Sequence, residues 1–164
     1  MSSYLALAVS VGVLAVVATW LFFSVDPVVA AHMQVWQAFI AWGCHYHSGG
    51  KLSGTTKTVV CMSFGAVVGM TAGTLATGAL ASLGQFAAPV AVGLGATVIC
   101  LASKLPLLGT IPASVYGFAS IAGLFLLGSG MSPTRALLPT ILSILIGAAF
   151  GYVSEALAGA LAKR

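Results

Sequence analysis

Long apolar segments alternate along the chain with short stretches rich in glycine, proline and polar residues. There are six such segments, at residues 4–25, 29–46, 58–82, 87–103, 111–129 and 136–161. Each is near the ~20 residues that a helix needs to cross ~30 Å of hydrocarbon. None shows the short alternating pattern of a membrane β-barrel strand. The pattern therefore predicts six transmembrane helices.

The composition supports the same class of protein. Of the 164 residues, 60% are hydrophobic and only 5% are charged, and the mean hydropathy is +1.12. A soluble domain needs far more charge to cover its surface. We therefore expect one all-α integral membrane domain over residues 1–164, with halves at 1–82 and 83–164.

The few charged residues predict an orientation. With six crossings, one side of the membrane receives Lys51, Lys57, Lys104, Lys163 and Arg164. Only Arg135 falls on the other side, together with Asp26. Positive residues are retained on the cytoplasmic side, so we expect both termini there. The net charge of +4 does not indicate a nucleic-acid partner, because the cations are scattered and form no basic run.

The third predicted helix of each half follows a cation and carries spaced glycines. With three helices per half, the second half would be inverted relative to the first, as in many transporters. Glycines four residues apart share a helix face and allow another helix to approach closely. The helix-packing residues predicted in this way are Gly65, Gly69, Gly73, Gly147, Gly151 and Gly159. The partner helix can belong to the same chain or to another subunit, and we expect a homo-oligomer.

Three blocks of sequence, "AFIAWGCHYHSGG", "TIPASVYGFASIAG" and "LLPTILSILIGAAFGY", occur in this order. Their order and spacing resemble the YcdZ-like family of small bacterial inner-membrane proteins. The resemblance implies a multi-pass protein of the bacterial inner (cytoplasmic) membrane. It implies no site residue, because that family is one of unknown function.

The second predicted helix has an unusual polar face. At 100° per residue its glutamines, Cys44 and His45 fall on one side, and the fifth helix presents a milder version around Ser120. A polar stripe in a membrane helix needs partner helices or water beside it. Two such faces meeting would line a narrow pathway, for which we expect Gln34, Gln37, Ala41, Cys44, His45, Tyr116, Ser120 and Gly123. The alternative is that these polar groups only bond neighbouring helices.

Glu155 lies on the same helix face as Gly151 and Gly159. A carboxylate in hydrocarbon is costly and usually faces the protein interior or water. One interpretation places it near the cytoplasmic surface, reaching toward Lys104 or the cations of the tail. The other makes it an intramembrane proton site.

The sequence indicates no catalytic, cofactor or metal site. Its two acids, Asp26 and Glu155, are predicted on opposite sides of the membrane and cannot form a carboxylate pair. No phosphate-binding loop is present. His45 and His47 point about 200° apart on a helix, so we expect histidines of the membrane surface and not metal ligands.

The leading hypothesis is a passive channel or facilitator for a small neutral or weakly charged solute of unknown identity. The scarcity of buried charge makes ion conduction a poorer fit. A proton- or ion-coupled carrier that uses Glu155 is one alternative. A non-transport accessory subunit, docked through its glycine faces, is another.

Overall fold

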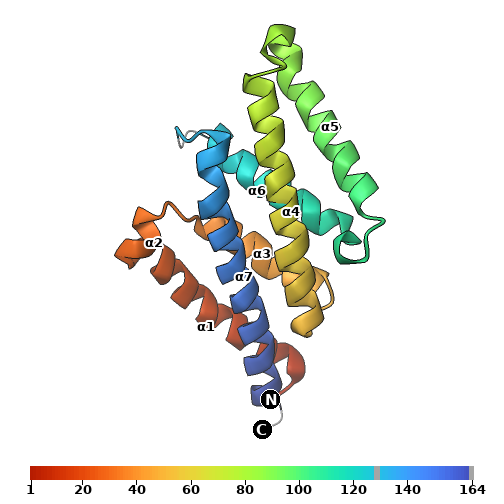
Figure 1. Cartoon of the computed structure of the whole chain (residues 1–164). Helices are drawn as coiled ribbons and strands as arrows, with labels where there is room; N and C mark the ends of the chain where they lie inside the picture. The colour runs from red at the N-terminus through yellow and green to blue at the C-terminus, as the bar shows by residue number, and fades with distance from the viewer. Residues whose placement is uncertain (128–129, 163–164) are drawn as a thin grey trace.

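A computed structural model of the chain describes residues 1–127 and 130–162. These residues form helices and no β-strand (Figure 1). The helices are α1 (Ser3–Ser24), α2 (Asp26–Ala30), α3 (Val35–His47), α4 (Lys51–Thr77), α5 (Ala87–Ala102), α6 (Ile111–Leu126) and α7 (Pro133–Ala162). Two 3₁₀ turns, η1 (Ala81–Phe86) and η2 (Pro106–Leu108), precede α5 and α6.

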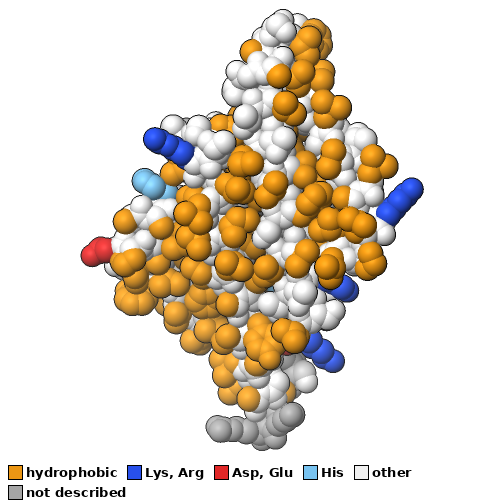
Figure 2. Space-filling model, viewed as in Figure 1, with side chains coloured by type: hydrophobic (Ala, Val, Ile, Leu, Met, Phe, Trp, Pro, Cys, Tyr) orange, Lys and Arg blue, Asp and Glu red, His pale blue; other side chains and the backbone are white. Residues whose placement is uncertain are grey.

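Four helical stretches within the described residues are long and apolar enough to cross a membrane. They are Ser3–Ser24, Lys51–Thr77, Ala81–Ala102 and Pro133–Ala162. Figure 2 shows that hydrophobic side chains cover most of one face, with the charged side chains at its periphery. A soluble monomer rarely exposes an apolar surface of this extent.

The other two predicted segments form shorter helices than expected. The segment 29–46 is divided, because α2 ends at Ala30 and α3 begins at Val35, with His32 between them at a φ of 55°. Helix α3 has 13 residues and α6 has 16, which at 1.5 Å per residue is about 20 and 24 Å. Both are shorter than the ~30 Å hydrocarbon core. Four of the six segments therefore lie in a helical stretch of the expected length, and the segment 87–103 reaches that length only together with η1.

The long helices α4 and α7 lie side by side at the centre and run in opposite directions (Figure 1). Helix α1 packs against α7, and α5 packs against α4. The short helices cross behind this layer, with α3 against α7 and α6 against α4. The start of α1 and the end of α7 lie at the same end of the molecule (Figure 1).

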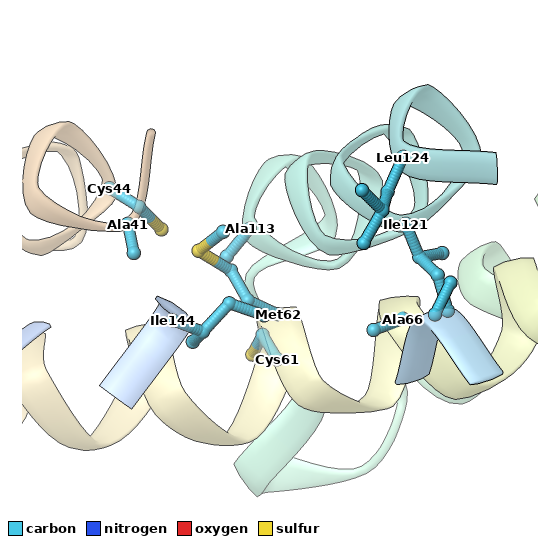
Figure 3. Packing of buried hydrophobic residues seen from close by; sticks show 10 residues of the cluster. Ala41, Cys44, Cys61, Met62, Ala66, Ala113, Ile121, Leu124 and Ile144 are labelled. Atoms are coloured by element: carbon cyan, nitrogen blue, oxygen red, sulfur yellow. The ribbon is translucent and has the colours of Figure 1, made fainter. Parts of the chain in front are cut away.

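The core lies where α3, α4, α6 and α7 meet, and its side chains are mostly small. Figure 3 shows Met62 and Cys61 of α4 close to Ile144 of α7 and Ala113 of α6, all of them fully buried. Small side chains let the helix backbones approach closely, which is how helices associate in lipid. This close packing fixes α3 and α6 against the two central helices.

Five of the six predicted packing glycines lie at contacts between helices of this chain. A Cβ atom at Gly65 would meet the carbonyl oxygen of Ser114, and one at Gly147 would meet that of Ala38. The places of the other three are similar: Gly69 faces Ile121 and Phe118, Gly73 faces Phe125 and Pro133, and Gly151 faces His45. Gly159 is the exception, because a Cβ there would meet no described atom within 4 Å. It lies near the end of α7 and makes no close helix contact within the described chain.

Candidate functional site

A cavity of about 350 Å³ opens between the start of α3 and the end of α6. Its lining is His32, Gln34, Trp36, Gly123, Leu124, Leu127 and Met131. The backbone N–H of Gln34 donates to Ser143 Oγ at 3.0 Å, which fixes the start of α3 on α7. Gly123 leaves room for the indole of Trp36, because a Cβ there would lie 2.8 Å from the ring. Two residues expected to line a pathway, Gln34 and Gly123, therefore lie at this cavity.

Gln37 lies one helical turn deeper and is fully buried. Its Nε2 donates to the Ser120 carbonyl oxygen at 2.9 Å and to Thr140 Oγ1 at 3.0 Å, joining α3 to α6 and α7. A carbonyl oxygen only accepts hydrogen bonds, so the amide nitrogen of Gln37 must face Ser120. The structure thus brings together Gln37 and Ser120, which the helical periodicity placed on facing stripes.

Two polar atoms of this contact have no hydrogen-bond partner among the described residues. They are Oε1 of Gln37 and Oγ of Ser120. A buried polar atom without a partner costs about 1–3 kcal/mol, so each such atom requires an explanation. Thr58 Oγ1 is a third; the Cys44 thiol lies near it but is only a weak partner. Unsatisfied polar groups therefore gather where α3, α4, α6 and α7 meet.

The remainder of the predicted lining is closely packed. Ala41 and Cys44 continue the face of α3 beyond Gln37, and both are buried. Cys44 Sγ lies 3.6 Å from Ser48 Oγ, at the end of the helix. Tyr116 of α6 packs edge-on against the ring of His47, with ring centroids 5.8 Å apart. The predicted lining is thus open to the cavity at Gln34 and Gly123 and closely packed from Gln37 to the far end of α3.

His45 lies in a different arrangement from the rest of the stripe, in a pair with Glu155 of α7. His45 Nε2 is 3.0 Å from Glu155 Oε2. His45 Nδ1 is 3.1 Å from Thr55 Oγ1 of α4. Glu155 Oε2 also accepts the backbone N–H of Lys51 at 2.5 Å, at the first residue of α4. One carboxylate therefore joins the end of α3 to the beginning of α4.

The pair is exposed on one side only. The His45 side chain is 0% exposed and that of Glu155 is 33% exposed. Glu155 lines a surface cavity of about 280 Å³ together with Lys51, Leu52, Tyr152 and Ala156. Solvent in this cavity therefore reaches the carboxylate and not the imidazole.

Two expectations about these residues are wrong. Glu155 does not reach toward Lys104 but binds His45 and the backbone of Lys51, because the corner between α3 and α4 folds over α7. The tail cations Lys163 and Arg164 lie outside the described residues. His45, which was expected as an exposed histidine of the membrane surface, is instead fully buried, and α7 covers it at Gly151. The two members of the pair are far apart in sequence, and no local pattern indicates their contact.

A second polar contact, also missed from the sequence, joins α1, α3 and α7 at Ser154. Trp42 Nε1 donates to Ser154 Oγ at 2.9 Å, and Tyr46 Oη lies 2.7 Å from the same oxygen. Ser10 Oγ donates to the Ser154 carbonyl at 2.7 Å. The side of α3 that carries Trp42 and Tyr46 is thus a packing face held by polar bonds.

The side chains give no indication of a metal centre. No group of three or more His, Cys, Asp and Glu residues within the described ranges is arranged to hold a metal ion. The cysteines are free: Cys44 and Cys61 are buried, and Cys100 is exposed.

Fold and site together define an all-helical protein with the apolar helices of a membrane protein and a polar cluster inside. The chain belongs to the family described as "Protein of unknown function (DUF1097)", which matches residues 8–159. No curated protein and no solved structure matches it. The description of the family assigns no activity to its members.

Proposed function

We propose that the protein is a multi-pass membrane channel or facilitator that passes a small neutral or weakly charged solute between α3 and α6. One observation carries the proposal: Gln37 Oε1 and Ser120 Oγ are buried without partners among the described residues, one turn below an open cavity. In a contact that only packs helices, the side chains would satisfy these atoms. A passing solute would satisfy them in turn.

The chemistry of this contact favours a neutral solute. Gln37 Oε1 accepts hydrogen bonds, and the Ser120 hydroxyl both donates and accepts. A solute with hydroxyl or amide groups, or water itself, complements this pair. The described residues that line the cavity include no Lys, Arg, Asp or Glu, whereas ion paths usually present carbonyl or charged rings.

Six crossings in two inverted halves, residues 1–82 and 83–164, form the second part of the proposal. Gly65 of α4 meets a short helix at Ser114, and Gly147 of α7 meets the other short helix at Ala38. We call the separation in sequence from Gly65 to Gly147 the long-helix interval. The separation from Ala38 to Ser114 is the short-helix interval.

The next glycines along the two long helices repeat both intervals. Gly69 and Gly151 are again separated by the long-helix interval, and they meet Ile121 and His45. His45 and Ile121 are separated by the short-helix interval. Equal intervals in two successive sets of contacts support a repeat.

The long-helix interval, but not the short-helix interval, recurs in a further pair of contacts. Cys61 of α4 donates to the Leu107 carbonyl just before α6, and Ser143 of α7 accepts from the Gln34 N–H just before α3. Cys61 and Ser143 are also separated by the long-helix interval. Because α4 and α7 run in opposite directions (Figure 1), the two halves would be inverted relative to each other, the plan of many transporters.

The repeat also accounts for Thr58. Thr58 and Thr140 are separated by the long-helix interval, and both are fully buried. Thr140 accepts from Gln37, whereas the residue one short-helix interval after Gln37 is Ala113, which offers no polar side chain. Thr140 therefore bonds a glutamine, and Thr58 has none to bond. Gln37 therefore departs from the packing that the two halves share, and such a departure is expected of a functional residue.

Orientation and location follow from the charge pattern. We propose that both termini are cytoplasmic and that the membrane is the bacterial inner membrane. Lys51 begins α4 at the end of the molecule where α1 starts and α7 ends, in agreement with the positive-inside rule. The homo-oligomer stays a prediction.

Stopped-flow light scattering on proteoliposomes tests the proposal across a panel of small neutral solutes and weak acids. We expect solute-selective swelling that Gln37→Leu slows about tenfold, the effect of one lost hydrogen bond in the barrier. Ser114→Ala is the matched control, because Ser114 is equally buried but lies on the α4 side of α6. Wild-type permeability equal to that of empty liposomes would overturn the proposal.

A further inference from the structure

We propose that His45 and Glu155 form a proton-binding site that controls the corner between α3 and α4, residues 48–50. The site itself is independent of any transported solute. What the corner controls rests on the proposed function, because the corner closes the end of the α3 face opposite the cavity. Ser48 of this corner contacts Cys44, on the predicted path.

A count of hydrogens assigns the proton. Thr55 has one hydroxyl hydrogen, which it donates to the Lys51 carbonyl at 3.0 Å. The Thr55 oxygen can then only accept from His45, so His45 Nδ1 carries a hydrogen. A neutral imidazole with hydrogen on Nδ1 would turn a lone pair toward the carboxylate. With this placement of the Thr55 hydrogen, the 3.0 Å contact between Nε2 and Glu155 Oε2 holds one further proton.

Loss of that proton changes the contacts of α4. Without it, the hydrogen on His45 must move to Nε2 to face the carboxylate, and Nδ1 then needs a donor. The only donor beside it among the described contacts is the Thr55 hydroxyl. If Thr55 turns its hydrogen to His45, the Lys51 carbonyl loses its side-chain partner. The proton is thus linked to the first turn of α4.

The backbone at the end of the corner needs these bonds at one residue, Lys51. Gly49, Gly50 and Lys51 all have positive φ, at 101°, 67° and 54°. Positive φ is uncommon for a residue with a side chain, so Lys51 needs local contacts to hold it there. Glu155 supplies them by accepting its N–H. The Glu155 carboxylate also lies close to Gly50: a Cβ atom at Gly50 would be 2.8 Å from Glu155 Oε1.

Packing alone does not require this pair. One short-helix interval after His45, the second half has Ile121. One long-helix interval before Glu155, the first half has Gly73. Ile121 fills the place against Gly69 with apolar atoms. The same helix contact is therefore made without a titratable group.

Protons reach the pair through the surface cavity at Glu155. The charged and titratable groups around it are Tyr46 of α3, whose ring lies 5.2 Å from that of His45, Lys51 of α4 and Tyr152 of α7. A proton taken up from water binds Glu155 and is shared with His45 Nε2. It leaves by the same route.

Hydrogen exchange of residues 48–55, measured by mass spectrometry across pH on the purified full chain, tests the site. After correction for intrinsic rates, we expect exchange in the wild type to rise roughly fivefold as the pair loses its proton, the effect of one lost hydrogen bond. Residues 133–137, the corresponding first turn of α7, should show no step. Glu155→Gln keeps an acceptor for the Lys51 N–H but removes the negative charge that stabilises the proton on the buried pair, so its step should move to lower pH.

A second pair of variants covers the case in which Glu155→Gln does not fold. Thr55→Val should lose the step, whereas Thr56→Val, whose hydroxyl bonds only the Leu52 carbonyl of its own helix, should keep it. A wild-type profile without a step, or one that all variants share, would overturn the site. A pH-dependent step in hydrogen exchange without solute flux would support the proton site and contradict the proposed channel. Solute flux without such a step would support the channel and contradict the proton site.

Discussion

Ser154 joins three helices through its hydroxyl and carbonyl oxygens. Ser154→Ala would leave the Trp42 N–H and the Tyr46 hydroxyl without this partner. Interhelical hydrogen bonds in membranes contribute about 0.6 kcal/mol on average and up to ~1.7. We therefore expect a loss of about 1–2 kcal/mol in the free energy of unfolding, measured by denaturant titration in detergent. Ser103→Ala is the control, because the Ser103 hydroxyl is not buried and bonds only its own turn. Equal stability of the two variants would contradict this account of Ser154.

The glycines of the α3–α4 corner provide a second comparison at the residue scale. Gly49 and Gly50 both have positive φ, but a Cβ would meet Glu155 only at Gly50. Either alanine variant should lose roughly 1–2 kcal/mol from the backbone conformation. Gly50→Ala should lose more, because it also displaces the carboxylate from Lys51. The unfolding free energies of the two variants measure the difference, and a Gly49→Ala variant as unstable as Gly50→Ala would contradict a holding role for Glu155.

Single residues also show where sequence reasoning stopped. The helical period of 3.6 residues placed Gln37 and Ser120 on facing stripes, and they are in contact. The same reasoning placed His45 on that stripe but did not indicate its contact with Glu155, because a contact between residues so distant in sequence is created by the tertiary fold. Thr140, the third member of the Gln37 contact, was missed for the same reason.

At the scale of the helices, close backbone contact at glycine holds α6 against α4. A Cβ at Gly117 would meet the Met62 carbonyl, whereas one at Gly93 of α5 would meet no described atom within 4 Å. Gly117→Ala should therefore lose about 1–3 kcal/mol of stability by overpacking. Gly93→Ala should gain up to ~1 kcal/mol from helix propensity. Thermal unfolding followed by circular dichroism distinguishes them, and a shift of the same sign in both would argue against close packing at Gly117.

The helix boundaries show what apolar patterning can and cannot determine. Helix α1, Ser3–Ser24, nearly coincides with its predicted segment at 4–25, because its start is capped locally by Ser2 and it packs mainly on one helix, α7. Helix α4 begins at Lys51, well before the predicted start at residue 58, because the carboxylate of Glu155 caps a polar first turn. A hydropathy pattern cannot predict a helix cap whose acceptor belongs to another helix.

At the scale of the whole molecule, the account requires six crossings with both termini on one side. A green fluorescent protein fused after residue 164 should fluoresce, and alkaline phosphatase fused there should be inactive. Reporters inserted at η1, residues 81–86, should give the opposite result, because η1 lies at the other end of α4 (Figure 1). The same reporter pattern at both places would contradict the orientation.

The central claim, a path between α3 and α6, is tested most directly by the reactivity of cysteines placed on two sides of α6. In a background without native cysteines, Ser120→Cys and Ser114→Cys start equally buried, at 0% and 1% exposure. A small water-soluble thiol reagent added to proteoliposomes should modify Ser120→Cys and block solute flux, and should leave Ser114→Cys unmodified. Equal reactivity of the two, or none at Ser120→Cys while solute still passes, would contradict a path at this contact.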